Sequence, residues 1–248
     1  MKIKLINPNT TRAMTESCKK AAMRAAREGT EIIAVSPKTG PDSIECYTDD
    51  YLAVPGILEE IIIGDQIEGA DAYIIACFGD PGLQAAREIT SKPVVGIAEA
   101  AMLFARVISP CFSIVSVLDR SRKITADLVE SYGMSNCCRS IRTTGLSVLD
   151  FGQDPERGLT ALERQARLAV EEDKAECILL GCAGFVDFVD DMNKRLPVPV
   201  LDGVAPAVKM AESLVELGLS TSKMSTWSYP EYKRFAGFPQ IKIPTKKG

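Results

Sequence analysis

The stretch DAYIIACFGDPG, from Asp71 to Gly82, decides the fold because it combines a strand, a cysteine and the start of a helix. Its apolar run from Ala72 to Ala76 is typical of a strand that is buried on both faces. The tripeptide DPG then introduces the helical sequence GLQAAREI. Cys77 is therefore predicted at the carboxyl end of a strand, where ligands gather in open α/β sheets. The positive end of the following helix should make this thiol easier to ionise.

The same order of features occurs again in ECILLGCAGFVDF, from Glu176 to Phe188. An acidic residue and an apolar strand again precede a cysteine, Cys182, and a helix. Alternating strands and helices predict βαβ units and parallel sheets. We therefore expect an α/β fold of two pseudo-symmetric lobes, each a four-stranded mainly parallel sheet flanked by helices. Cys77 and Cys182 would then face each other across one cleft between the lobes.

Eight segments are predicted to be strands, in the order KIKLI (2–6), EIIAVS (31–36), AYIIA (72–76), KPVVGI (92–97), CFSIVSVL (111–118), GLSVLDF (145–151), ECILLG (176–181) and VPVLDG (198–203). Helices are expected from Arg12 to about Glu28 and over residues 52–69, where Pro55 should start or kink the helix. Residues 1–97 and 206–224 are assigned to the first lobe, residues 98–205 to the second, and residues 225–248 to a C-terminal tail. Its last four residues, TKKG, are expected to be mobile.

The composition is that of an ordinary globular protein. The chain has 248 residues and a formal net charge of −4, and no block of one sign suggests binding to nucleic acid or a membrane surface. We find no signal peptide or membrane anchor, so we expect a cytoplasmic protein. Its eight cysteines are then expected to be thiols.

The chain contains no histidine. Ser-His-Asp triads, Cys-His pairs and His-based zinc sites are therefore excluded. No nucleotide-binding glycine motif is present, and the adjacent Cys137 and Cys138 lack further ligands at useful spacing for a metal. We expect neither a metal nor a cofactor.

Two thiols on opposite sides of a planar carbanion could invert a carbon centre, since one would remove a proton while the other delivers one. Gly79, Gly181 and Gly184 would let backbone amides approach the developing enolate oxygen. Cysteine is more often a small buried apolar residue, and this is our interpretation of the other six. The repeated context favours a functional role for Cys77 and Cys182.

Five segments, INPNT, GPDSIE, YIIACFGDPGL, PVVGIAEAA and LGCAGF, resemble those of the hydantoin and allantoin racemases in the aspartate/glutamate racemase superfamily. The resemblance spans about residues 1–219. It implies a cofactor-independent racemase, usually a homo-oligomer, with Cys77 and Cys182 as its two bases. The chain departs from the common family pattern at Cys46, where glycine is expected, and in the segment VSVLDR.

The resemblance also suggests which residues contact the substrate. In the amino-acid racemases of the superfamily, polar residues follow the two cysteines and hold a carboxylate, whereas here Phe78 and Ala183 follow them and favour a neutral ring. Ile44 and Phe185 are expected to touch the group at C5 of a hydantoin. The remaining expected substrate contacts are Asn9, Gly79, Ser116, Val117 and Gly184. Asn9 is equally well explained as a residue that closes a turn or caps a helix.

The predicted function is racemisation at C5 of allantoin or a 5-substituted hydantoin. An amino-acid racemase is one alternative, although Phe78 and Ala183 disfavour it. The other is a non-catalytic small-ligand-binding protein in which the cysteines only pack.

Overall fold

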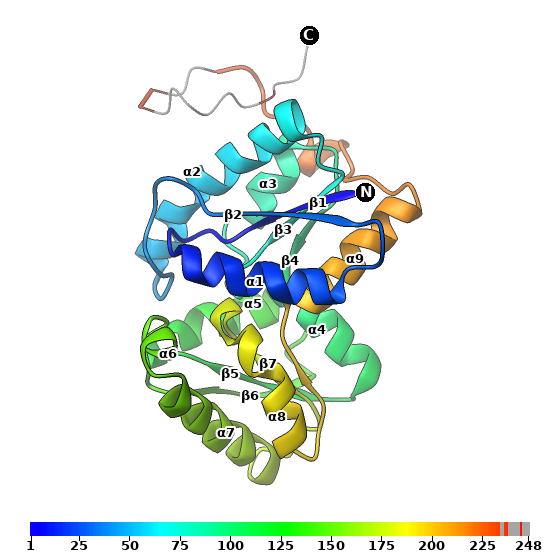
Figure 1. Ribbon diagram of the computed structural model, residues 1–248. Helices are drawn as coiled ribbons and strands as arrows, with labels where there is room; N and C mark the ends of the chain where they lie inside the picture. The colour runs from blue at the N-terminus through cyan, green and yellow to red at the C-terminus, as the bar shows by residue number, and fades with distance from the viewer. Residues whose placement is uncertain (234–235, 238–243, 245–248) are drawn as a thin grey trace.

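Two separate four-stranded parallel sheets organise the chain in the computed structural model, which describes residues 1–233, 236, 237 and 244 (Figure 1). The first sheet has the order β2-β1-β3-β4, and the second repeats it as β6-β5-β7-β8. Every neighbouring pair is parallel. The strands are β1 (Lys2–Ile6), β2 (Glu31–Val35), β3 (Ala72–Ile75), β4 (Val94–Gly96), β5 (Phe112–Ser116), β6 (Cys138–Thr143), β7 (Ile178–Leu180) and β8 (Val200–Leu201). The predicted fold class is confirmed.

Helices cover both faces of each sheet. They are α1 (Arg12–Ala25), α2 (Tyr47–Ile63), α3 (Leu83–Ile89), α4 (Ile97–Ile108), α5 (Arg122–Ser131), α6 (Asp150–Gln153), α7 (Pro155–Glu171), α8 (Val189–Arg195) and α9 (Val204–Glu216). A π-helical turn (Gly64–Glu68) extends α2, and 3₁₀ helices lie at Asp119–Ser121, Ala183–Phe188 and Ser225–Trp227.

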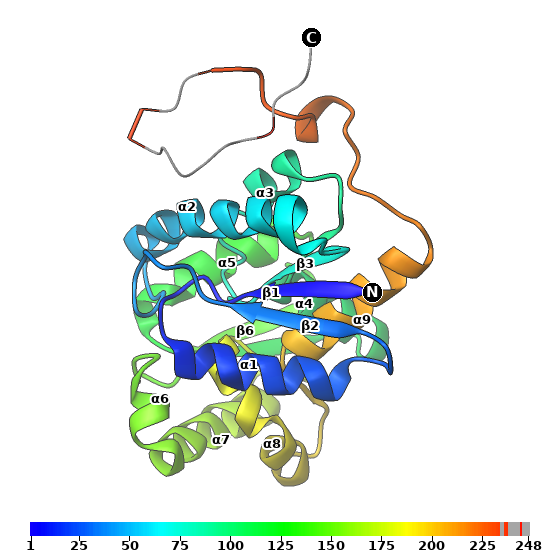
Figure 2. The same ribbon diagram turned by 45° about the horizontal axis from the view of Figure 1, so that its top comes forward.

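The first sheet is buried because its central strands are almost entirely apolar. Its two faces pack against different helices, with α1 and α9 on one side and α2 and α3 on the other. Figure 2 shows α1 and α2 on opposite sides of β1 and β2. The one buried charge in β1 is Lys4, whose side chain is fully buried and forms ion pairs with Glu60 at 2.8 Å and Glu68 at 2.6 Å.

The second sheet is enclosed in the same way. Apolar side chains of α4 and α5 pack on one face, and those of α7 and α8 pack on the other. Burial of apolar side chains on both faces is the main contribution to the stability of such a layered unit.

The two lobes share part of a core and are connected twice by the chain. Ala183 and Val186, from the 3₁₀ helix of the second lobe, belong to the apolar cluster under α1 and α9. The chain passes from β4 through Ile97 into α4 and the second sheet, and later through Gly203 into α9, which packs on the first sheet. A Cβ atom at Gly203 would lie 2.3 Å from the carbonyl oxygen of Ile97, so the two crossings are in contact. The lobe boundaries at residues 97 and 205 stay predictions.

One strand prediction is wrong. The second strand of the second lobe is β6 (Cys138–Thr143), whereas GLSVLDF forms a loop that leads into α6. β6 is an edge strand rich in polar residues, and the guanidinium of Arg142 donates to Asp173 at 2.6 Å. GLSVLDF looks apolar because Leu146, Val148 and Phe151 are buried as a cover over the same core.

The helix around Pro55 begins earlier than expected, at Tyr47, so Pro55 lies inside it and does not start it. In the tail, the indole N–H of Trp227 donates to Gln84 in α3 at 2.8 Å, and Arg87 lies over the ring. The segment TKKG lies outside the described residues. Within the described part of the chain, no helix is long and apolar enough to cross a membrane.

Candidate active site

A cavity lies between the lobes, at the carboxyl ends of β3, β5 and β7. The lining residues come from both lobes: Asn9, Met14, Ile44, Glu45, Cys46, Asp50, Ala76, Cys77, Phe78, Gly79, Ser116, Val117, Ser121, Ile124, Thr125, Val148, Gly181, Cys182 and Ala183. Parallel strands place their carboxyl ends at one edge of each sheet, and the two edges face this space.

Most of the residues that the sequence suggested lie together in this cavity. They are Asn9, Ile44, Cys77, Phe78, Gly79, Ser116, Val117, Cys182 and Ala183. Two others do not line it. Phe185 is fully buried in the core of the second lobe, 4.4 Å from the Phe151 ring centre to centre. Gly184 lies behind Cys182, and its amide donates to the Cys182 Sγ at 3.4 Å.

Cys77 and Cys182 occupy equivalent positions in the two lobes. Each follows the third strand of its sheet by two residues, after β3 and after β7. Both side chains are partly exposed, and both are free thiols. The sheets therefore present one sulfur from each lobe to the same cavity.

Burial controls the ionisation of both thiols. It raises the pKa of Cys77 well above the ordinary value, although a backbone hydrogen bond from Gly79 acts in the opposite direction. Burial raises the pKa of Cys182 to about 12, against the hydrogen bond from Gly184. The prediction of an easily ionised thiol is wrong, because burial raises the pKa of both thiols. The turn after Cys77 delays α3 until Leu83, and the loss of hydration outweighs the nearby amides.

Asn9 lines the cavity and also forms hydrogen bonds within its own loop. Its Oδ1 accepts the Thr11 amide at 2.9 Å and the Asn7 side-chain amide at 2.9 Å. This arrangement is an Asx turn that leads the chain from β1 into α1. The turn-closing role is therefore present whether or not Asn9 also contacts a ligand.

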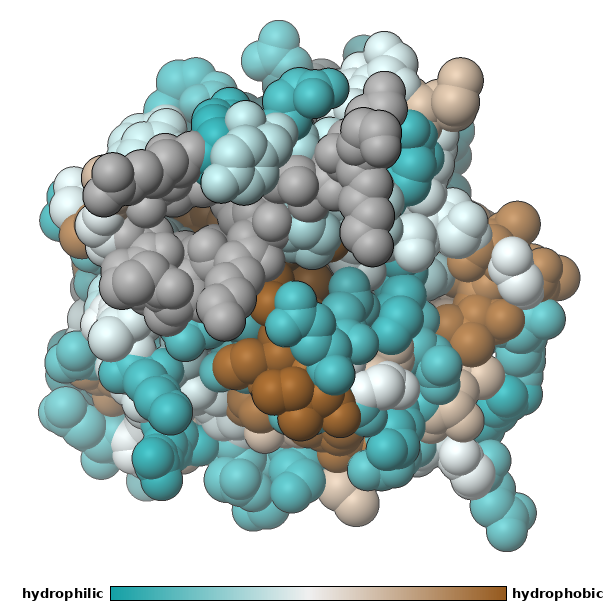
Figure 3. Space-filling model, turned by 90° about the horizontal axis from the view of Figure 1, so that it is seen from above, coloured by the Kyte–Doolittle hydropathy of each residue, from teal (hydrophilic) through white to brown (hydrophobic). Residues whose placement is uncertain are grey.

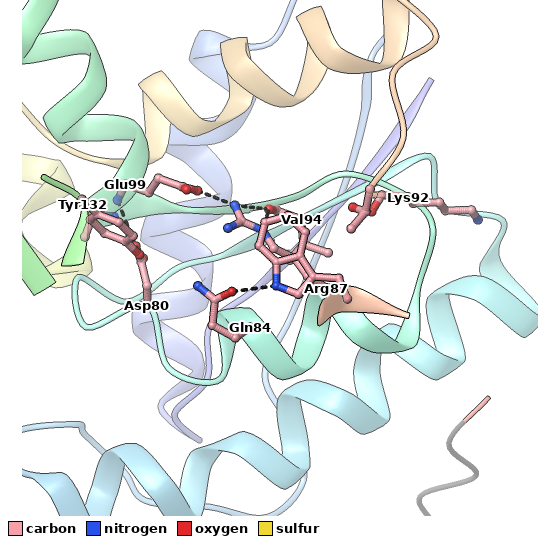
Figure 4. A network of polar contacts seen from close by, with 10 residues as sticks. Asp80, Gln84, Arg87, Lys92, Val94, Glu99 and Tyr132 are labelled. Atoms are coloured by element: carbon pink, nitrogen blue, oxygen red, sulfur yellow. Dashed lines mark hydrogen bonds and ion pairs between the residues drawn. The ribbon is translucent and has the colours of Figure 1, made fainter. Parts of the chain in front are cut away.

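The turn after Cys77 is anchored by Asp80, which is buried and has a φ of 45°. Its carboxylate accepts the amides of Ala98 at 3.0 Å and Glu99 at 2.9 Å, at the start of α4. The hydroxyl of Tyr132, at the end of α5, donates to the same carboxylate at 2.7 Å (Figure 4). Asp80 thus ties the Cys77 turn to α4 and to the end of α5. Burial raises its pKa to about 7, and these three donors act against that rise.

Two acidic residues of the cavity were not singled out from the sequence. Glu45, from the segment GPDSIE, accepts the Val148 amide of the other lobe at 2.6 Å, and its charge also raises the pKa of Cys182. Asp50, in the first turn of α2, has a buried Oδ1. Nothing in the sequence KTGPDSIECYTDD marks which of its acids faces inward.

The cavity is lined by acidic side chains and, among the described residues, by no cationic one. Glu45 and Asp50 line it, while no lysine or arginine is among its lining residues within the described chain. A carboxylate ligand would lack a cationic partner there, whereas a neutral ligand with N–H donors would find acceptors.

A family model described as Asp/Glu/Hydantoin racemase matches residues 3–211. Over 237 residues the chain is 56% identical to a hydantoin racemase from Pseudomonas sp. (strain NS671), which covers 96% of this chain and 95% of that relative. A hydantoin racemase from Rhizobium meliloti is 46% identical over 237 residues, covering 96% of this chain and 98% of the relative.

A solved structure of an allantoin racemase from Klebsiella pneumoniae superposes with a TM-score of 0.93. It is 43% identical and covers 96% of both chains. A structure of arylmalonate decarboxylase, at 16% identity and a TM-score of 0.65, shares the fold. The resemblance stated from the sequence is confirmed.

Proposed function

Since the chain belongs to the Asp/Glu/Hydantoin racemase family and is a racemase, we propose that it inverts C5 of a neutral hydantoin ring by moving protons between Cys77 and Cys182. The substrate is allantoin or a 5-substituted hydantoin. The observation that carries this proposal is the pair of cysteines at equivalent strand ends, facing one cavity whose lining, in the described part of the chain, includes no lysine or arginine.

The proposed reaction uses one sulfur as a thiolate and the other as a thiol. The thiolate removes the C5 proton, and the electron pair of the C–H bond moves toward the neighbouring ring carbonyl to give an enolate. The opposite thiol then delivers its proton to the other face of C5. The first sulfur ends as a thiol and the second as a thiolate, so the enzyme is ready for the reverse direction. For reacting atoms ~3 to 3.5 Å apart on each side, the two sulfurs should stand about 7 Å apart around the substrate.

The polarity of the cavity supports a neutral ring over an amino acid. An aspartate or glutamate substrate would bring one or two carboxylates next to Glu45 and Asp50, where like charges repel. Phe78 and Ala183, which follow the two cysteines, offer no side-chain donor to a carboxylate. Turnover of aspartate or glutamate would contradict the proposed substrate class.

The division of labour between the sulfurs gives the test. Polarimetry with single enantiomers should show loss of optical rotation for allantoin or a 5-substituted hydantoin. Cys77→Ser and Cys182→Ser should each abolish inversion, while the remaining cysteine exchanges the C5 proton of one enantiomer with heavy water. The enantiomer that takes up deuterium should differ between the two variants.

Cys138→Ser is the matched control, because Cys138 is partly buried in β6, outside the cavity. It should racemise both enantiomers like the unaltered chain. If either cavity variant retained full racemisation, or if both exchanged the same enantiomer, the two-base proposal would be wrong.

A further inference from the structure

Asp50 is a cavity carboxylate without a structural task. It lies in the first turn of α2, and its Oδ1 is buried without a hydrogen-bond partner among the residues that the structure describes. The neighbouring Asp49 has a different role, because its Oδ2 accepts the Glu45 amide at 3.0 Å and holds the loop. Loop structure therefore does not explain why a carboxylate stands at position 50.

Gly79 gives Asp50 access to the same space as Cys77. A Cβ atom built on Gly79 would lie 3.1 Å from Asp50 Oδ1 and 3.9 Å from Cys77 Sγ. Both atoms therefore border the space that a side chain at position 79 would fill. A ligand atom held in this space can contact the carboxylate while its neighbouring carbon faces the sulfur.

A buried carboxylate oxygen without a donor is costly, because it has lost hydration without replacement. Burial raises the pKa of Asp50 to about 6, and the charge of Asp49 adds to the rise. The group is still mainly ionised in weakly alkaline buffer. No lysine or arginine among the described lining residues neutralises the Asp50 carboxylate. An N–H group of a ligand would supply the hydrogen-bond donor that this carboxylate lacks.

We propose that Asp50 is a specificity-determining residue whose carboxylate accepts the N1–H of the hydantoin ring, next to the carbon that faces Cys77. This inference rests on the proposed function. N1 is bonded directly to C5, whereas N3 lies on the far side of the C4 carbonyl. Among the ring donors, N1–H is therefore the one that can reach Oδ1 while C5 stays against the sulfur.

The test compares protein variants with methylated substrates. Racemisation kinetics are measured by circular dichroism for a 5-substituted hydantoin and for its 1-methyl and 3-methyl derivatives. Asp50→Ala should raise KM for the parent and 3-methyl substrates about 10- to 100-fold with a smaller change in kcat, since a hydrogen bond to a charged group is lost. Asp50→Asn, which keeps an acceptor oxygen and the same shape, should fall between Asp50→Ala and the unaltered chain.

The 1-methyl substrate separates binding from folding. It has no N1–H to donate, so its KM should be nearly the same in Asp50→Ala, Asp50→Asn and the unaltered chain, as expected for two changes that remove one contact. Glu59→Gln is the matched control, because it neutralises a carboxylate of α2 that does not line the cavity. It should leave KM unchanged for all three substrates.

Three outcomes would contradict this inference. Equal KM for the parent substrate in Asp50→Ala and the unaltered chain would overturn the inference alone, provided that the unaltered chain racemises hydantoins. Loss of the Asp50 effect with the 3-methyl instead of the 1-methyl substrate would refute the assignment to N1. If the unaltered chain racemised neither hydantoins nor allantoin, the proposed function and this inference would both fail.

Discussion

At Cys77 and Cys182, burial and hydrogen bonding act on the thiol pKa in opposite directions, and burial has the larger effect. A thiol of raised pKa is a stronger base once ionised but is rarely ionised near neutral pH. The same burial excludes water from the place where the C5 proton would move. Without a bound substrate, both sulfurs should therefore react slowly with electrophiles.

We expect this low thiol reactivity to appear in the alkylation rates. For Cys77 and Cys182 in the unliganded protein, the rate with iodoacetamide should be far below that of a free cysteine peptide at pH 8. Because the thiolate fraction grows as the pH approaches a raised pKa, the rate should increase about tenfold per pH unit and continue to rise through pH 10. The peptide control should level off near its pKa of about 8.5. Mass spectrometry of the two cysteine peptides gives the rates, and a plateau below pH 9 would contradict the raised values.

The repeated pattern identified the two cysteines, and the family resemblance identified other cavity residues such as Ile44 and Ser116. Cys77 and Cys182 were found because strand, cysteine and helix recur in the same order. Asp50 was missed because it stands among several acids, and α2 begins earlier than its apolar residues indicate. Phe185 was expected near the substrate, but the 3₁₀ helix after Cys182 turns its ring into the core. The direction in which such a side chain points depends on tertiary packing, which a single sequence does not reveal.

Among the secondary-structure elements, α4 and α5 meet at the carboxylate of Asp80. The folded pKa of Asp80, about 7, lies above its ordinary value of 3.8. The folded chain therefore keeps a proton that the unfolded chain releases, and the contribution of Asp80 to stability falls as the pH rises from about 4 to 7. Above that range both states are ionised and the contribution is constant.

Tyr132→Phe tests this junction. The hydroxyl of Tyr132 holds the pKa of Asp80 down, so its removal should let that pKa rise and extend the decline in stability to higher pH. We expect a loss of about 1.5 to 3 kcal/mol in the free energy of unfolding at pH 8 and a smaller loss at pH 5. Urea unfolding at both pH values measures this.

Tyr47→Phe is the control for Tyr132→Phe. Its hydroxyl also donates to an aspartate across the lobes, Asp127 at 3.3 Å, but in an exposed position. This variant should unfold like the unaltered chain at both pH values. An equal loss at pH 5 and pH 8 in Tyr132→Phe would show that the hydroxyl does not act through the Asp80 carboxylate.

Most strands could be predicted because apolar runs mark them, and β6 could not. Four of the six residues in its sequence CRSIRT are polar, as an edge strand allows. GLSVLDF carries apolar side chains for a different reason, since a loop also covers part of the core. Hydrophobicity reports burial, and it identifies a strand only where the buried segment is also extended.

For the whole molecule, the duplicated strand order made the two-lobe architecture predictable, including the placement of both cysteines in one cavity. The contacts that fix the lobes to each other were not predictable. Glu45 meets the Val148 amide and Asp80 meets Tyr132 across long stretches of sequence, without any repeated motif. These contacts decide which side chains border the cavity.

The helix α9 packs on the first sheet but follows the whole second sheet in the chain, and this has a consequence for synthesis on the ribosome. The helix α9, which packs against α1, β1, β3 and β4, is made only after residues 98–203. Until then the first sheet lacks a cover to which fully buried residues such as Val204 and Val208 each contribute about 1.5 to 3 kcal/mol. The first sheet is therefore synthesised before the second sheet, but its packing is completed only after the second sheet has been made.

A nascent chain released at residue 203 should contain a protease-resistant second lobe beside a first lobe that is readily cut. A chain ending at residue 233, which keeps α9, should resist cleavage in both lobes. Limited proteolysis with mass spectrometry of the fragments distinguishes the two, and equal resistance of the first lobe in both chains would mean that α9 is not needed to complete it. The emerging enzyme would thus carry an apolar sheet face, open to chaperones or to aggregation, for the whole time in which its second lobe is translated.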